Sequence, residues 1–554
     1  MSVTVIFDLE MKTRDGVTLR SDVYLPDRKG KYPLIVLRSP YNADDPVFSR
    51  YCAEFCKQGI GVVCQSTRGT GASDGDFNIS RQECEDGEDF LNWIAGQDFC
   101  NGNIVTNGES YPGHTQWQLA RHGHSVMKGL TPHNAPLEFY SVAMRTGGAW
   151  GFGLATVWAF GTRLRRLHSD LKIDWNTMRW HLPLADLDTA IGLEKWQVWQ
   201  DWMQHVTRDE FWRGSADAMS AVSNVTAPAF ITGGWFDAFL PQTLQVFSEM
   251  RKNAGSEQAR KFTRLVMEPL DHDMRTHDID YGPEHLAGII KTRNRFMANI
   301  LKDPENDPLP DQPPAHLFVM GSNKWIDAEE WPLPETQYTN VYLRGCAPAN
   351  SVAGSGKLSF DAPAGNDEIT EHFYYNPMEP VPTWGGCTLG IAVGQRWQDD
   401  IEKRSDVLVF TSEPLTEDLD VIGNVKAVIY AATDGKDTDF TVKVCDVGPD
   451  GRSINLCDGL LRGRFLNGFD EEILLEPGKA YAYGIDCWAT SWTFLKGHRI
   501  RVQVSSSNFP RFDRNLNTGL HLTRSSELRI ASQTVFHNAD MPSHVILPVI
   551  PRKK

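Results

Sequence analysis

A serine placed between glycines is the first candidate for chemistry. Ser110 lies in the stretch TNGESYPG, with Gly108 before it and Gly113 after it, and the β-prone run NIVT leads into it. A strand that ends in a tight Gly-x-Ser turn and opens a helix is typical of a nucleophile elbow, whose strained backbone needs small neighbours. Pro112 stands where glycine is more usual, but the first turn of a helix tolerates proline. The motif alone fits a nucleophile or an ordinary strand–turn–helix serine.

An acid and a histidine follow two later apolar runs. The run PAFIT (228–232) leads to Asp237, and RLVM (264–267) leads to His272. Reactive groups gather past the carboxyl ends of strands in an α/β sheet, and the hydrolase order is Ser, acid, His. We therefore expect His272 to take the proton of Ser110 during attack on a carbonyl and to return it to the leaving group. Asp237 would hold the tautomer of the imidazole and stabilise the imidazolium.

The negative charge of a tetrahedral intermediate needs hydrogen-bond donors, and two are available. The backbone amide of Tyr111 follows the serine directly, and Tyr41 follows the apolar run PLIVL in the sequence RSPYN. An oxyanion hole in this fold class combines such an amide with a donor from a loop after an earlier strand. The alternative for Tyr41 is simple packing against the edge of the sheet.

The elements that must position these residues follow an α/β pattern. The N-terminus predicts an antiparallel hairpin, with a turn at Asp15-Gly16. Short apolar runs without alternation follow, which suits strands buried on both faces of a mostly parallel sheet. These runs are at 33–37, 60–64, 103–106, 228–232 and 264–267, with a helical pattern at 84–97 and a final sheet strand predicted at 316–320.

Two further regions differ from the α/β part in composition and in hydrophobic pattern. Segments 150–168 and 194–206 are rich in Trp and Leu and fit helical periodicity, which predicts a cap inserted over the sheet. The C-terminal part alternates apolar and polar residues between Asp-Gly turns, which predicts an all-β sandwich or jelly roll. We expect a core at 1–138 and 222–332, a helical cap at 139–221 and a jelly-roll domain at 333–554.

Bulk properties exclude several classes of function. The net charge of −16, with no basic patch between aromatics, argues against binding to nucleic acid or to anionic membranes. The chain has no apolar run of 18 residues, and its start does not resemble a signal peptide. Its ten cysteines are scattered and contain no CxxC motif, so we expect reduced thiols in a cytoplasmic protein.

Clusters of polar residues elsewhere have simpler interpretations than a metal or cofactor site. The loop DHDMRTHDID (271–280) and the acidic helix segment at 84–89 are expected to be solvated. His114 is expected to be a surface or helix residue. Asp434, Asp437 and Asp439 are expected in a β turn that lacks the pattern of a calcium loop. We expect no metal and no cofactor.

The chain resembles the cocaine esterase family, which also contains X-prolyl dipeptidyl aminopeptidases and α-amino acid ester hydrolases. The motifs that carry this resemblance follow in family order along nearly the whole chain: RDGVTLRSDVYLP, RSPY, STRGTGASDGDF, NGESYPG, GGWFDAF, DHDM and GHRIRVQVSSSNFPRFDRN. The resemblance implies an α/β-hydrolase core, a helical cap and a C-terminal jelly roll. It also implies the roles given above for Ser110, Asp237, His272, Tyr41 and Tyr111.

The resemblance extends to an acyl pocket. Trp158, ten residues after Gly147-Gly148, and Phe239, two residues after Asp237, match aromatic positions that favour a bulky or aromatic acyl group. The alternative is that both are ordinary core aromatics. The α-amino acid ester hydrolases have acidic residues where this chain has Phe239 and Leu240, so an ammonium site at these positions is not expected.

Ester hydrolysis through an acyl-enzyme is therefore the expected function, with a small-molecule ester or amide as the substrate. An amidase, acylase or aminopeptidase with the same triad remains an alternative. A non-catalytic protein that binds its partner through the jelly roll is another, because fold does not imply function. The oligomeric state stays open, and a homodimer or a larger homo-oligomer is suggested only by analogy with relatives.

Overall fold

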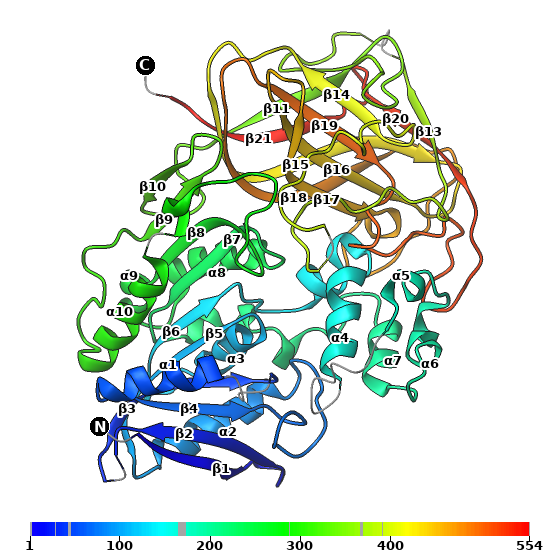
Figure 1. Cartoon of the computed structure of the whole chain (residues 1–554). Coiled ribbons are helices and arrows are strands. Elements are labelled where there is room, and N and C mark those ends of the chain that lie inside the picture. Colours follow the sequence, from blue (N-terminus) through cyan, green and yellow to red (C-terminus); the bar gives the residue numbers. More distant parts are fainter. Residues whose placement is uncertain are drawn as a thin grey trace.

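A central sheet of ten strands forms the lower part of the molecule, and a second, β-rich domain lies above it (Figure 1). This computed structural model describes residues 3–27, 29–41, 46–163, 173–286, 288–365, 369–390 and 392–552. In the part of the chain that it describes, no helix is both long and apolar enough to cross a membrane.

The ten-stranded sheet is parallel in its centre and antiparallel at both edges. The N-terminal hairpin is present as predicted, and each of the five apolar runs forms a strand. The spatial order is β1 (Thr4–Lys12), β2 (Thr18–Leu25), β4 (Gly61–Ser66), β3 (Tyr32–Ser39), β5 (Cys100–Glu109), β6 (Met127–His133), β7 (Phe230–Phe236), β8 (Arg264–Asp271), β9 (Ala315–Val319) and β10 (Lys324–Ala328).

Two of these strands differ from the expectations. β6 was not predicted, because the sequence MKGLTPH contains a lysine, a glycine and a proline and has no apolar run. The predicted strand at 316–320 is present as β9, but it is not the last strand of the sheet. The short strand β10 pairs with it in antiparallel orientation and forms the edge.

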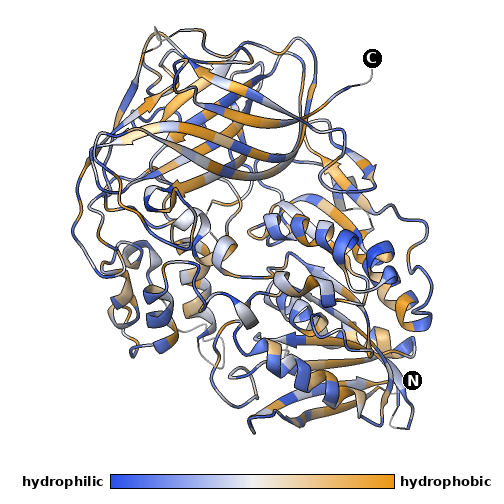
Figure 2. Cartoon of the chain, turned by 180° about the vertical axis from the view of Figure 1, so that it is seen from behind, coloured by the Kyte–Doolittle hydropathy of each residue, from blue (hydrophilic) through white to orange (hydrophobic). Residues whose placement is uncertain are grey.

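Helices cover both faces of the sheet, which explains the unbroken apolar runs. In β3, Leu34 and Val36 contact the cluster that holds α2 (Glu83–Ala95), α3 (Tyr111–Ala120) and α8 (Leu240–Asn253). Ile35 between them faces the opposite cluster, with residues of α1 (Pro46–Lys57) and α10 (Ile289–Lys302). Figure 2 shows the hydrophobic residues gathered along the strands of both domains.

The cap lies between β6 and β7 and is built from short helices, in agreement with the predicted helical insertion. Its α-helices are α4 (Val157–Thr162), α5 (Trp175–Met178), α6 (Leu187–Ala190) and α7 (Gln197–Gln204), preceded by π-helical turns at Tyr140–Met144 and Phe152–Thr156. The predicted helical segment 150–168 is helical from Phe152 to Thr162, and its residues from 164 lie outside the described part of the chain.

The C-terminal domain is mostly β-sheet, as predicted, and it does not close into a barrel. Strands β13, β20, β15, β21, β11, β12, β14, β19, β16 and β17 follow one another in the sheet, and β18 pairs with β15. Their bounds are β11 Gln337–Arg344, β12 Gly356–Ser359, β13 Glu371–Tyr375, β14 Leu408–Ser412, β15 Leu419–Thr433, β16 Asp439–Val447, β17 Ser453–Arg462, β18 Tyr481–Phe494, β19 Arg499–Ser505, β20 Ala531–Phe536 and β21 His544–Ile550.

The two domains are joined by main-chain and side-chain bonds. The amide of Met320, just after β9, donates to the carbonyl of Ser491 in β18 at 2.9 Å. Asp278 in the loop after β8 pairs with Arg396 of the C-terminal domain at 2.9 Å. The expectation of a merely solvated loop at 271–280 was therefore wrong, because this loop forms part of the domain interface.

Acidic residues from the segment expected to be solvated and from the expected β turn are buried in ion pairs. Asp86, on the inner side of α2, accepts hydrogen bonds from Nε and Nη2 of Arg68. Asp437 and Asp439 are likewise buried, and they bond Arg464 and Arg462. The sequence segments looked polar because their arginine partners lie elsewhere in the chain. Asp434, in contrast, is exposed.

Candidate active site

Ser110 lies on a sharp turn between β5 and α3. Its backbone has φ 63° and ψ −125°, a conformation that an L-residue adopts only under strain. Its amide donates to the carbonyl of His133 at 3.0 Å, and its own carbonyl accepts from Gly113 at 2.9 Å. A Cβ on Gly113 would lie 2.4 Å from that of Ala135, so the turn requires this glycine. The geometry is that of the predicted nucleophile elbow.

Asp237 and His272 meet at the carboxyl ends of β7 and β8. Oδ2 of the fully buried Asp237 is 2.5 Å from Nδ1 of His272, and Oδ1 accepts from the amide of Phe239 at 2.7 Å. Because an ionised carboxylate only accepts, Nδ1 carries the proton, and Nε2 has the lone pair that a general base needs. The predicted acid and histidine are thus in direct contact.

The charges around His272 shift its titration. Burial opposes a positive charge on the ring, but the charge and hydrogen bond of Asp237, with the charges of Glu109 and Asp273, outweigh it and raise the pKa of His272 above its ordinary value. Asp271, although adjacent in sequence, accepts hydrogen bonds from Nε2 of His277 at 2.8 Å and from the amide of Arg275 at 2.9 Å. Its carboxylate is thus engaged in its own loop.

The hydroxyl of Tyr41 is held beside the serine. It accepts a hydrogen bond from Nε1 of Trp158 at 3.0 Å and bonds the side chain of Ser110. Burial raises the pKa of Tyr41, so its proton stays on the oxygen at neutral pH. Since Trp158 supplies one donor to this oxygen, the proton of Tyr41 itself is free to point to Ser110 or to an oxyanion.

Tyr111 is anchored through its hydroxyl, whereas its backbone amide is left available. Its amide is the first of α3 and has no acceptor inside the helix, as holds for every helix N-terminus. Its hydroxyl donates to Glu83 at 3.2 Å and accepts from the amide of Ser80 at 2.9 Å. Glu83 in turn pairs with the buried Arg38 at 3.0 Å. This chain of contacts anchors the residue whose amide faces away from the helix.

Aromatic rings line the space around these groups. The ring of Trp158 stacks on Tyr111 at a centroid distance of 5.6 Å and on Phe139 at 6.3 Å, and it meets Phe77 edge-on. Phe239 lies edge-on to His272, with ring centroids 5.4 Å apart. Both predicted pocket residues, Trp158 and Phe239, are therefore beside the triad candidates.

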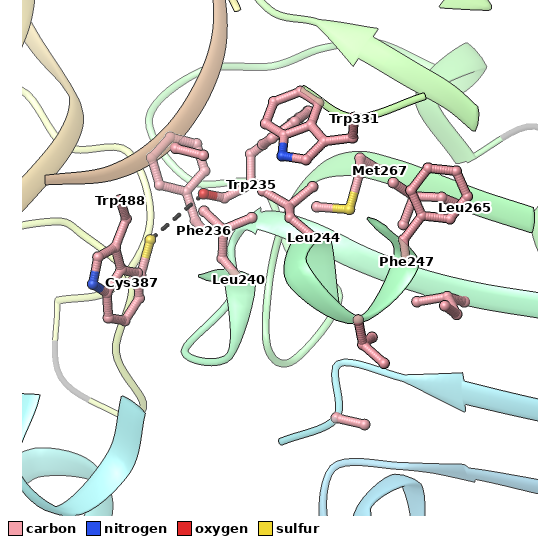
Figure 3. Packing of buried hydrophobic residues seen from close by; sticks show 14 of the residues in the cluster. Trp235, Phe236, Leu240, Leu244, Phe247, Leu265, Met267, Trp331, Cys387 and Trp488 are labelled. Carbon is pink, nitrogen blue, oxygen red and sulfur yellow. Dashed lines mark hydrogen bonds between the residues drawn. The ribbon is translucent and has the colours of Figure 1, made fainter. Parts of the chain in front are cut away.

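Sequence reasoning missed three members of this cluster. Phe77 ends the motif STRGTGASDGDF, and its place in that motif could have marked it as a residue of the site. Phe139 lies in no motif that would have indicated such a role. Leu389 comes from the C-terminal domain and packs against the same cluster. Beside it, Sγ of Cys387 donates to the carbonyl of Trp235 in β7 at 3.5 Å (Figure 3). The C-terminal domain therefore contacts the hydrophobic cluster to which these rings belong.

Other polar candidates lie outside the chemistry. His114 is fully buried in α3, between the hydroxyl of Ser80 at 2.9 Å and the carbonyl of Pro136 at 3.1 Å. Burial lowers the pKa of His114 to about 3, so the ring is neutral. The expectation of a helix residue was right, and that of a surface residue was wrong. Within the described ranges, no group of three metal-ligating side chains comes together.

Comparison with known proteins agrees with this geometry. The profile described as X-Pro dipeptidyl-peptidase (S15 family) matches residues 15–273, and that of the X-Pro dipeptidyl-peptidase C-terminal non-catalytic domain matches residues 309–546. The chain is 36% identical to a cocaine esterase of Rhodococcus sp. (strain MB1 Bresler), over 99% of each chain. It is 23% identical to a putative serine esterase of Mycobacterium bovis, over 90% of each.

Solved structures share the whole architecture. An aminopeptidase from a marine sediment Thaumarchaeota archaeon has a TM-score of 0.86 at 23% identity, over 99% of this chain and 97% of that one. An α-amino acid ester hydrolase has a TM-score of 0.82 at 23% identity, over 99% and 96%. At this identity the likeness concerns the fold. The full-length match to the Rhodococcus enzyme shows more: the chain belongs to the family of α/β-hydrolases that contains cocaine esterase and the X-Pro dipeptidyl-peptidases.

Proposed function

We propose that the protein is a serine hydrolase that cleaves carboxylic esters through an acyl-enzyme. The observation that carries this proposal is the strained turn of Ser110 at the sheet edge where Asp237 binds Nδ1 of His272. Membership in a family with a cocaine esterase at 36% identity supports the same reaction. An ester is an activated acyl donor, and a nucleophile of this kind divides its hydrolysis into two easier steps.

Each side chain then has a defined task. Ser110 attacks the ester carbonyl while Nε2 of His272 takes its proton, and the imidazolium returns that proton to the departing alcohol. Water repeats the sequence on the acyl-enzyme and releases the acid. Asp237 keeps the proton on Nδ1 and stabilises the imidazolium. The hydroxyl of Tyr41 and the amide of Tyr111 donate to the oxyanion, a contribution worth about 2.7–4 kcal/mol for one donor.

The acyl group that fits best is bulky or aromatic. Trp158, Phe139 and Phe77 offer ring faces and edges beside the oxyanion donors, and Phe239 adds another next to the base. An aromatic acyl group gains both burial and ring–ring contact there. The positions of Phe239 and Leu240 offer no carboxylate to an ammonium on the acyl side, so an α-amino acyl group gains nothing at this point.

A fluorophosphonate probe and a panel of p-nitrophenyl esters test the proposal. Wild type should be labelled on Ser110 and should hydrolyse the benzoyl ester faster than the acetyl ester. Ser110→Ala should lose both labelling and turnover, whereas the control Ser125→Ala, which removes an exposed serine, should keep both. Labelling that persists in Ser110→Ala would refute the assignment of the nucleophile.

Hydrolysis of an amide is the second candidate, because one matching profile describes a peptidase. The same residues serve both reactions, which differ in how far the leaving group must be protonated. Benzoyl esters and benzoyl amides, compared on one enzyme preparation, separate them: an esterase has the larger kcat/KM for the ester by more than the intrinsic difference in reactivity.

A further inference from the structure

Trp158 belongs to the cap, yet its side chain reaches a group that is proposed to hold the oxyanion. It is the second residue of α4, and its Nε1 donates a hydrogen bond to the hydroxyl oxygen of Tyr41 at 3.0 Å. Tyr41 follows β3 of the core and bonds the side chain of Ser110, so this contact joins the cap to the core beside the nucleophile. The mechanism above uses the ring of Trp158 for the acyl group and gives its N–H no task.

Aromatic contacts hold the indole ring of Trp158 in place. The ring stacks on Tyr111 with an interplanar angle of 27° and on Phe139 with an interplanar angle of 15°. Phe77 meets it edge-on at a centroid distance of 6.4 Å. A ring that is confined in this way presents its N–H in one direction. The amide of Tyr111 is the other proposed oxyanion donor, so Trp158 contacts both residues of the proposed oxyanion hole.

The N–H of Trp158 limits where the hydroxyl proton of Tyr41 can point. An indole nitrogen only donates, whereas a phenolic oxygen both donates and accepts. The proton of Tyr41 therefore does not lie on the line to Trp158, where two protons would meet, and the remaining direction leads to Ser110. An oxygen that accepts one hydrogen bond also becomes a better donor of the next, because hydrogen bonds in a chain polarise one another.

We propose that Trp158 is a positioning residue of the oxyanion hole, whose indole N–H directs the hydroxyl proton of Tyr41 toward the oxyanion. This inference rests on the proposed ester hydrolysis and adds to it, because the cap then takes part in the reaction of every acyl group, aromatic or not. Donors that already point at the developing charge need no reorganisation during the reaction. Without the N–H of Trp158, the hydroxyl of Tyr41 is free to rotate away and must be turned back in each cycle.

An amino-acid analogue removes the N–H and keeps the ring. Replacement of Trp158 by benzothienylalanine exchanges the N–H for a sulfur at nearly the same size, so the aromatic contacts are retained. The kcat of this variant for p-nitrophenyl acetate and for p-nitrophenyl benzoate should be about three- to tenfold lower than that of wild type, as expected for one hydrogen bond. The matched control is the same replacement at Trp212, whose Nε1 donates to the carbonyl of His205 at 2.9 Å, also between β6 and β7. Its kcat should change less than about twofold.

A second set of variants decides whether the effect passes through Tyr41. In the Tyr41→Phe background there is no hydroxyl to direct, so the replacement at Trp158 should lower kcat less than about twofold. A residue that only shapes the acyl pocket gives another result: the benzoate ester loses rate, the acetate ester does not, and the loss is the same with or without the hydroxyl of Tyr41. That result overturns the positioning role, and so does an unchanged kcat for both esters.

The rate of labelling by a fluorophosphonate distinguishes failure of this inference from failure of the proposed function. Phosphonylation of Ser110 also places negative charge on an oxygen in the oxyanion hole, and it needs no ester substrate. Its second-order rate constant should fall by a similar factor in the Trp158 variant and stay unchanged in the Trp212 control. If wild type hydrolyses neither ester, the proposed function is refuted, and the labelling rates still decide on Trp158. Equal labelling rates in wild type and in the Trp158 variant overturn the positioning role.

Discussion

Two buried pairings of carboxylate and cation, one in each domain, use their hydrogen bonds differently. In the core, Asp237 holds one nitrogen of His272 and leaves the other available. In the C-terminal domain, the buried Arg462 makes four hydrogen bonds to Asp439 and Asp513, and Asn515 adds a fifth to Asp439 at 2.8 Å. Both pairings are almost inaccessible to water.

The two pairings differ in whether their cation can give up its proton, and this decides whether they serve catalysis or stability. Arginine keeps its proton at any pH a protein survives, so the bonds around Arg462 do not depend on a proton transfer. Histidine exchanges its proton near neutral pH, and the incomplete coordination of His272 gives that proton somewhere to go. The fully bonded Arg462 therefore stabilises the fold. His272 keeps Nε2 available, so it can act as a base in a reaction.

The largest effect is expected from breaking the incomplete pairing. Asp237→Asn should lower kcat by roughly 10⁴, because the asparagine favours the wrong tautomer of His272. Since Asp237 raises the pKa of His272, its loss should also move the acid limb of kcat/KM to lower pH. In wild type, kcat/KM should rise with pH through a pKa above about 6.5, as the imidazole loses its proton. Rate profiles from pH 5 to 9 measure both shifts.

Asp271→Asn is the control for that variant, because Asp271 is adjacent to His272 in sequence but bonds His277 and Arg275. It should lower kcat less than about tenfold and leave the acid limb in place. A loss of the same size in both variants would show that general charge, not the contact with Nδ1, supports the base.

Breaking the complete pairing should change stability instead. Arg462→Met leaves Asp439 and Asp513 buried without their cation, and should lower the free energy of unfolding by about 3–5 kcal/mol. Arg552→Met is the matched control: Arg552 also bonds two carboxylates, Asp418 and Asp420, but it is 46% exposed. Its loss should cost at most about 1 kcal/mol. Urea unfolding followed by circular dichroism measures both; equal losses would contradict the comparison.

The smallest effect is expected at the oxyanion donor. Tyr41→Phe removes one hydroxyl and keeps the ring, so kcat should fall about 10²–10³-fold while the fold is retained. Labelling of Ser110 by the fluorophosphonate should persist, since the triad is intact. If kcat is unchanged, Tyr41 only packs, and its bond to Trp158 serves the cap instead.

The sequence alone was sufficient for features with a local signal. The unbroken apolar runs predicted the strands before Asp237 and His272 because a sheet covered on both faces requires them. The glycines around Ser110 predicted the elbow because no larger residue fits there. The domain bounds at 138, 221 and 332, and the oligomeric state, stay predictions.

Features that depend on distant partners had no such signal. Asp86 and Asp439 are charged residues in polar segments, and only the folded chain places Arg68 and Arg462 against them. The strand β6 contains a lysine, a glycine and a proline and has no apolar run, yet it pairs between β5 and β7. Its place is determined by the neighbouring strands rather than by its own composition.

The contact of Leu389 with the aromatic cluster has a consequence for how this enzyme changes over time. Leu389 belongs to the half of the chain that holds none of the triad candidates, and it packs against the hydrophobic cluster to which Trp158 and Phe239 belong. Under the proposed function, substitutions there would alter which acids are accepted without changing a triad residue. Selection for new substrates thus has two separate regions of sequence on which to act, and the distal one carries the smaller risk of loss of activity.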